Sequence, residues 1–267
     1  MNVMESPVHQ SLYRSDFYRL LSISLDFPNL ENVSIIQEIS EALLESDLTD
    51  VRLKPLLENV KNFYTEEMIP SLESEYFRIF SSGMNCPESE GSYYPVDRGT
   101  ILGDVSAFYE AYKLQPSSKQ GTPDSMKMEL MFMSFLALKE GYAKESHDDD
   151  NLEIVIDSEK KFLQDHLGRW GFIFSLKLIE TSQIEFYRYI SMILELFLEL
   201  EIQNLKIQPI RVDSYLKPKN QENYDSQFEC AGSPPQTKTN NSDNSYNVTF
   251  TNSALGDTHE LFKNSST

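Results

Sequence analysis

The chain has 267 residues and a mass of 30.8 kDa, and 40% of its residues are apolar, enough to fill the core of one large domain or two small ones. Its 23 lysines and arginines stand against 42 aspartates and glutamates, a formal net charge of −19, so the bulk attraction to phosphate that supports nucleic-acid binding is absent. Cys86 and Cys230 lie far apart and form no CxxC motif, which argues against a disulfide scaffold, a structural zinc site or an iron–sulfur cluster.

Signals of export and of membrane insertion are also missing from the sequence. No segment approaches the roughly eighteen apolar residues of a membrane-spanning helix. The N-terminal residues MNVMESPVHQ contain no basic segment followed by an apolar one. We therefore expect a protein that works in the cytoplasm.

The predicted elements are helices. Only 10 glycines occur, no Asn-Gly or Asp-Gly turn signal is present, and apolar residues recur at spacings of three and four, which predicts an all-α, single-domain bundle of about eight to ten helices. In chain order we expect helices from about residue 10 to the Asp26-Phe27-Pro28 stop, over roughly 32–46 and 50–64, and then over 72–80, 101–112, 126–138, 162–174 and 186–204.

Two loops interrupt this series. Residues 81–99 hold three glycines and two prolines, which predicts neither helix nor regular strand, and a loop of this length in a compact domain is usually functional or disordered. After a second loop over 115–121, we expect Thr122 to cap a helix, with Pro123 at its first position and Asp124 in its first turn, where the helix dipole favours a carboxylate.

The helix from Met126 to Leu138 is apolar nearly all round, which is typical of a central helix covered by others. Glu129 lies within it and is expected to pair with a buried partner, because an uncompensated buried charge is costly. The acidic segment 145–150 that follows is expected to be a solvated linker.

The composition changes beyond Pro209, where polar stretches such as TKTNNSDNSYN cannot bury enough apolar area to offset the entropy of ordering. We expect one helical domain over 1–210 and a disordered tail over 211–267. The domain contains 18 basic and 35 acidic residues, so the negative charge belongs to the helical part.

The motifs of the common enzyme classes are absent: GxGxxG, GxxxxGK[ST], GxSxG and HExxH do not occur. His9, His147 and His259 are expected to be solvated, at chain ends or in the acidic linker, and Asp148 to Asp150 lack the glycine and glutamate of a calcium loop. We therefore expect neither a metal site nor catalysis.

Two further residues have a chemistry of their own. Cys86 has Glu88 and Glu90 nearby, which disfavour a thiolate, so we expect an unreactive thiol. His166 lies among apolar residues, where a core histidine held by a hydrogen bond is expected.

Three segments together carry a resemblance to a known family. These are Glu75-Tyr76-Phe77-Arg78-Ile79-Phe80 with Cys86-Pro87-Glu88-Ser89 and Tyr93-Tyr94, then Gly121-Thr122-Pro123-Asp124-Ser125 with Glu129-Leu130-Met131-Phe132-Met133, and finally Phe162 to Trp170 (FLQDHLGRW). With the segments in this order, the chain resembles the TorD/DmsD/NarJ-type assembly chaperones of molybdoenzymes over about residues 10–205. Its loop sequence and loop lengths resemble most the chaperones of the type II dimethyl-sulfoxide-reductase branch. One departure is Ser125, which stands where the family has a histidine.

The resemblance implies a TorD-like helical bundle and a cytoplasmic, non-catalytic function. Such chaperones bind the twin-arginine signal peptide, and often the immature body, of a molybdopterin oxidoreductase subunit until its cofactor is inserted and export follows. The molybdopterin would belong to the client, this chain would hold no stable cofactor, and weak GTP binding is implied without a motif that locates it. A monomer or a dimer formed by helix exchange would fit.

A receptor for a twin-arginine signal needs carboxylates for the guanidinium groups beside an apolar groove. We expect Glu88, Glu90 and Asp124 to face the arginines. The other residues expected at the client site are Tyr76, Phe80, Pro87, Tyr93, Tyr94, Pro123, Met126, His166 and Trp170. Plain core packing for the aromatic residues and a solvated loop for the glutamates stay open.

The rival class is a general helical adaptor that binds an amphipathic partner helix, for which an acidic surface and an aromatic groove would also serve. A nucleotide hydrolase ranks third, because the sequence offers no phosphate-binding loop and no set of metal-binding carboxylates.

Overall fold

The computed structural model describes residues 7–81, 85–94, 97–115 and 121–212. Nine α-helices form within these ranges, and the predicted all-α class is confirmed. They are α1 (Pro7–Ser24), α2 (Glu31–Glu45), α3 (Lys54–Phe63), α4 (Ile69–Phe80), α5 (Arg98–Ala111), α6 (Met126–Glu145), α7 (Asp149–Phe162), α8 (Gly168–Thr181) and α9 (Glu185–Leu205). Short 3-10 turns precede α4 and α5, and the β-structure of the described part is one isolated antiparallel bridge between Ser89 and Ser125.

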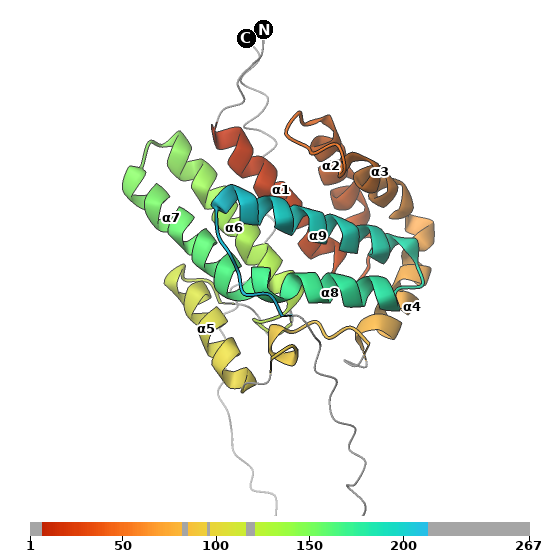
Figure 1. Ribbon diagram of the computed structural model, residues 1–267. Helices are drawn as coiled ribbons and strands as arrows, with labels where there is room; N and C mark the ends of the chain where they lie inside the picture. The colour runs from red at the N-terminus through yellow and green to blue at the C-terminus, as the bar shows by residue number, and fades with distance from the viewer. Residues whose placement is uncertain (1–6, 82–84, 95–96, 116–120, 213–267) are drawn as a thin grey trace, which may run out of the picture.

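The core forms where α6 packs against α1 and α7, while α9 lies beside α8 and also contacts α3 and α1 (Figure 1). Small side chains let α1 and α6 approach closely. Ser15 Oγ donates to the carbonyl of Ser134 at 2.9 Å, and Ser134 Oγ donates to the carbonyl of Ser15 at 2.9 Å. The central position predicted for the helix that begins at Met126 is confirmed, since most of its side chains are buried.

The start of α6 differs from the prediction. The helix begins at Met126, so Thr122 does not cap it and Pro123 and Asp124 precede its first turn. A tertiary contact causes this difference. The backbone N–H of Met126 donates to the carbonyl of Glu88 at 2.8 Å, and the backbone N–H of Glu90 donates to the carbonyl of Asp124 at 2.8 Å. This pairing holds the residues before Met126 in a turn and bridge instead of a helical turn.

The region after α6 was predicted incorrectly in two respects. The expected linker 145–150 is shorter than predicted, because α6 continues to Glu145 and α7 begins at Asp149. Asp148 caps α7 by accepting the N–H of Asn151 at 3.1 Å. The single helix expected over 162–174 is two helices joined by a π-helical segment, Leu163–Leu167.

The chain changes direction at this π-helical segment, between α7 and α8 (Figure 1). The helix that follows begins at Gly168, where a Cβ atom would lie 2.3 Å from the carbonyl oxygen of Leu163. Only glycine fits there without a shift of the backbone, so this residue permits the π-helical turn between the buried side chains of His166 and Trp170.

A charged cluster, which the sequence analysis did not predict, lies inside the bundle. Arg14 of α1 is 3% exposed and contacts three buried glutamates, each on a different helix. Its guanidinium nitrogens lie 2.7 Å from Glu140, 2.6 Å from Glu159 and 2.8 Å from Glu201. The sequence does not predict these ion pairs, because the four charged residues lie in four different helices and are far apart in the chain.

Other expectations fall as follows. His9 lies within α1 and is half-buried instead of sitting in a frayed end, whereas His147 is exposed as expected. Cys230, His259 and residues 213–267 of the expected tail lie outside the described residues. Within the described part, no helix combines the length and the apolar character that crossing a bilayer requires.

Candidate functional site

The three sequence segments that carried the resemblance meet in space. The loop after α4 pairs with the turn before α6 through the bridge between Ser89 and Ser125. The same loop reaches the π-helical segment, where Glu90 Oε2 lies 2.9 Å from His166 Nδ1. Packing of Tyr93 against Trp170, with ring centroids 5.2 Å apart, completes the junction.

A buried polar network lies at this junction. Trp170 Nε1 donates to Glu129 Oε2 at 3.0 Å, so the partner expected for Glu129 is an uncharged N–H donor. Burial raises the pKa of Glu129 well above its usual value, and the nearby charge of Glu90 raises it further, against the hydrogen bond from Trp170. Burial therefore favours the protonated, neutral form of Glu129. The network ties α6, α8 and the loop together.

Asp124 is fully buried and has partners in its own chain. It accepts the backbone N–H of Gly91 at 3.2 Å and lies 3.3 Å from the guanidinium of Arg98, which is itself partly exposed. The carbonyl of the preceding residue, Pro123, accepts the Tyr109 hydroxyl at 2.9 Å. Asp124 thus fixes the loop and the start of α5 instead of capping α6.

Of the twelve residues expected at the client site, eight are buried: Phe80, Pro87, Glu90, Tyr93, Asp124, Met126, His166 and Trp170. The other four are half-buried: Tyr76, Glu88, Tyr94 and Pro123. His166 is the hydrogen-bonded core histidine that the sequence predicted. Cys86 is fully buried, and burial raises the pKa of its thiol, as expected for an unreactive cysteine.

An exposed aromatic surface borders the half-buried part of this set. Phe27, which follows α1, is 38% exposed, and Phe77 of α4 is 55% exposed. The Phe27 ring lies 5.4 Å from the rings of both Tyr76 and Phe77. We call Phe27, Tyr76 and Phe77 the aromatic patch.

Two carboxylates stand beside the aromatic patch. The Tyr76 hydroxyl donates to Glu88 Oε1 at 3.2 Å, and Asp26, whose side chain is 47% exposed, pairs with Lys127 at 2.7 Å. Burial raises the pKa of Glu88, and the charge of Asp26 adds to this, while the Tyr76 hydroxyl and Lys127 oppose it. Aromatic faces and acidic groups are therefore adjacent at one surface.

Phe27 and Phe77 were not among the residues expected at the site. From the sequence, Phe77 lies in the helix expected over 72–80 and Phe27 in the stop of the first helix. The available signal was the offset of Phe77 by one residue from the i, i+4, i+8 spacing of Leu72, Tyr76 and Phe80, which turns it away from the core.

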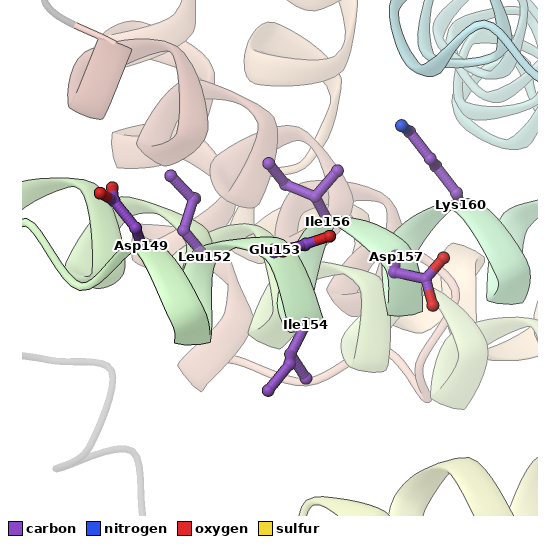
Figure 2. A pocket seen from close by; sticks show the side chains of 7 residues that line it. All are labelled: Asp149, Leu152, Glu153, Ile154, Ile156, Asp157 and Lys160. Atoms are coloured by element: carbon purple, nitrogen blue, oxygen red, sulfur yellow. The ribbon is translucent and has the colours of Figure 1, made fainter.

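A shallow hollow of about 580 Å³ lies elsewhere, on the outer face of α7 (Figure 2). Its described lining comes from α7 alone: Asp149, Leu152, Glu153, Ile154, Ile156, Asp157 and Lys160. None of the twelve expected site residues lines it. Among the residues that the structure describes, no group of three or more histidine, cysteine or acidic side chains is arranged to hold a metal ion.

The chain was compared with models of known protein families. The family model described as nitrate reductase delta subunit matches residues 44–175, from the end of α2 into α8. The matched region contains all twelve expected site residues and Phe77, whereas Phe27 precedes it. No curated protein matches the chain.

Proposed function

We propose that the chain binds the twin-arginine leader of a molybdopterin oxidoreductase subunit. The proposal is supported by the match of residues 44–175 to the nitrate reductase delta subunit family, a family of assembly chaperones for molybdoenzymes. The leader would be held at the aromatic patch, with Asp26 and Glu88 beside the arginines. Binding in the cytoplasm would keep the immature subunit from export until its molybdopterin is inserted, and the molybdopterin belongs to that client.

The observation that carries this proposal is the adjacency of exposed aromatic rings and carboxylates. A leader of this kind joins two guanidinium groups to an apolar segment. Aromatic rings bind apolar side chains and the faces of guanidinium groups, while carboxylates accept the forked hydrogen bonds of arginine. Phe27 and Phe77 offer the first surface, and Asp26 with Glu88 offer the second.

The buried members of the expected site would have a different task. Glu90, Asp124, His166 and Trp170 contact residues of their own chain, and these contacts fix the loop that carries Glu88. They would therefore position the surface instead of touching the peptide. The charge of the whole chain, −19, would speed the encounter with a cationic leader.

Calorimetry with a synthetic twin-arginine leader peptide and its Lys-Lys counterpart tests the proposal. We expect Phe77→Ala and Glu88→Gln to weaken binding of the arginine peptide roughly tenfold or more, and the Lys-Lys peptide to bind more weakly to the unchanged protein. Ile154→Ala is the matched control, because Ile154 is 59% exposed, lies in the α7 hollow and should not contribute.

Two results would contradict the proposal. Equal affinity for the two peptides would remove the role of the carboxylates. Binding that is lost in Ile154→Ala but kept in Phe77→Ala would move the partner to the α7 hollow and favour the general adaptor.

A further inference from the structure

A short segment after α9 turns back onto α8. Helix α9 ends at Leu205, and the next residue, Lys206, adopts a left-handed conformation with φ of 56°. Residues 207–212, which we call the strap, then run without helical structure to the N-terminal end of α8, as the blue trace in Figure 1 shows. The strap is an extended peptide that the chain lays on its own surface.

The strap is held by contacts with two residues of α8. The backbone N–H of Val212 donates to the carbonyl of Arg169 at 2.9 Å, and Arg169 Nε donates to the carbonyl of Ile210 at 3.4 Å. The guanidinium of Arg211 lies over the Phe172 ring, 3.5 Å from its centroid. Backbone hydrogen bonds and a cation on an aromatic face are the contacts by which a separate peptide is recognised.

The strap sits on the outside of the molecule. Ile210 is 81% exposed and Arg211 is also exposed, whereas Ile207 and Val212 pack against the core only in part. No side chain of the strap is buried within the bundle, so its release would leave the helical packing in place. Such a segment can be exchanged for another of the same chemistry.

The surface beneath the strap continues toward the loop that carries the client-site residues. Arg169 also stacks on Tyr94, with its guanidinium carbon 4.7 Å from the ring centroid. Tyr94 belongs to the same segment, 85–94, as Glu88. We call Tyr94, Arg169 and Phe172 the strap surface.

We propose that the strap surface binds an extended, arginine-bearing segment of a client polypeptide, and that residues 207–212 occupy this surface while no client is present. The strap shows which chemistry fits, because it presents Arg211 to Phe172 and its backbone to Arg169. This inference rests on the proposed function for the nature of the client. The strap is then an intramolecular competitor that a client must displace.

The test uses the full chain and a fluorescent peptide with the sequence of residues 206–213, KIQPIRVD. The double variant Arg211→Ala with Val212→Pro releases the strap, since it removes the guanidinium and the N–H donor. We expect the peptide to bind this released chain roughly tenfold or more tightly than the unchanged chain, because the tethered competitor is gone. Phe172→Leu in the released chain should abolish the gain while keeping an apolar side chain.

Leu176→Ala in the released chain is the matched control, because Leu176 lies one turn further along α8 and is 50% exposed. Equal peptide affinity for the unchanged and released chains, or no effect of Phe172→Leu, would overturn the inference. A twin-arginine leader peptide measured in parallel separates the two surfaces. If the strap peptide binds in a manner that depends on Phe172, the inference is supported even when no leader peptide binds. If the leader peptide binds in a manner that depends on Phe77 and the strap peptide does not bind, the inference is overturned while the proposed function stands.

Discussion

Arg14 and Glu159 meet between α1 and α7, with Nη2 2.6 Å from Oε2 and both side chains almost fully buried. Arg14 also contacts Glu140 and Glu201, so one buried cation faces three carboxylates. Burial raises the pKa of Glu159 to about 7, and the charges of Glu140 and Glu201 add to this, although Arg14 opposes it. This cluster links four helices through charge.

The first prediction concerns pH. A carboxyl group whose pKa is 4.5 in the unfolded chain and about 7 in the folded protein binds its proton more tightly when folded. The free energy of unfolding should therefore fall as the pH rises from about 4.5 to 7, by up to about 3 kcal/mol. Glu159→Gln, which still accepts a hydrogen bond from Arg14, should flatten this dependence and be the more stable protein at pH 8. Urea unfolding at pH 5, 6.5 and 8 measures the free energy of unfolding of both proteins. The same pH dependence in the unchanged protein and in Glu159→Gln would contradict the prediction.

The second prediction concerns the arginine of the same cluster. Arg14→Met leaves three buried glutamates without their cation, which should lower the free energy of unfolding by about 3–5 kcal/mol at pH 7.5. Arg52→Met is the control, because the side chain of Arg52 is 57% exposed and solvent screens its pair with Asp50, so the free energy of unfolding should change little. Equal losses in the two variants would show that burial of the cluster is energetically unimportant.

The third prediction concerns Glu129, whose neutral form is favoured because burial raises its pKa. Glu129→Gln keeps a neutral side chain of the same shape, and Trp170 keeps an acceptor. The free energy of unfolding at pH 7 should change by less than about 1 kcal/mol. Measurement by urea unfolding is sufficient.

Glu75→Gln is the matched contrast to this substitution. Burial raises the pKa of Glu75, but the hydrogen bonds from Arg78 and from the backbone N–H of Gln183 outweigh it and bring the pKa below its usual value. Glu75 is therefore ionised at pH 7, and its stabilising contribution is lost only as the pH falls through that lowered pKa. We expect Glu75→Gln to cost about 1.5–3 kcal/mol at pH 7. A greater loss in Glu129→Gln would mean that Glu129 is charged.

The fourth prediction compares two glycines. Gly168→Ala would place a methyl group against the backbone carbonyl of Leu163, so it should destabilise the protein by about 1–3 kcal/mol or more. Gly103→Ala, within α5, meets no atom within 4 Å and should stabilise by about 0.5–1 kcal/mol. Thermal unfolding should therefore shift in opposite directions. A rise of both midpoints would show that the backbone at the π-helical segment yields easily.

Most helices could be predicted from local patterns, because the apolar spacing of α1, α4, α6 and α9 follows the faces that these helices bury. The beginnings and ends of helices were less predictable. The start of α6 depends on backbone hydrogen bonds to the carbonyl of Glu88 and from the N–H of Glu90, which are more than thirty residues away. No pattern near Met126 reports such a partner.

The candidate site was predictable in part. The three sequence segments that carry the resemblance identified the region where the loop after α4, the turn before α6 and the π-helical segment meet. The family match covers all three segments. Which side chains of that region face outward was not predictable. Glu90 and Asp124 are buried among partners of their own chain, whereas Phe27 and Phe77 remain on the surface.

By itself, the sequence determined the helical class, the negative charge and the match to a chaperone family over residues 44–175, because composition, periodicity and motif order are properties of the chain alone. Only the tertiary structure decided that Arg14 contacts three glutamates, that burial beside Trp170 favours the neutral form of Glu129, and that Arg211 lies over the Phe172 ring. The physical reason is that the burial and charge state of a side chain depend on neighbours distant in sequence, which come together only when the helices pack.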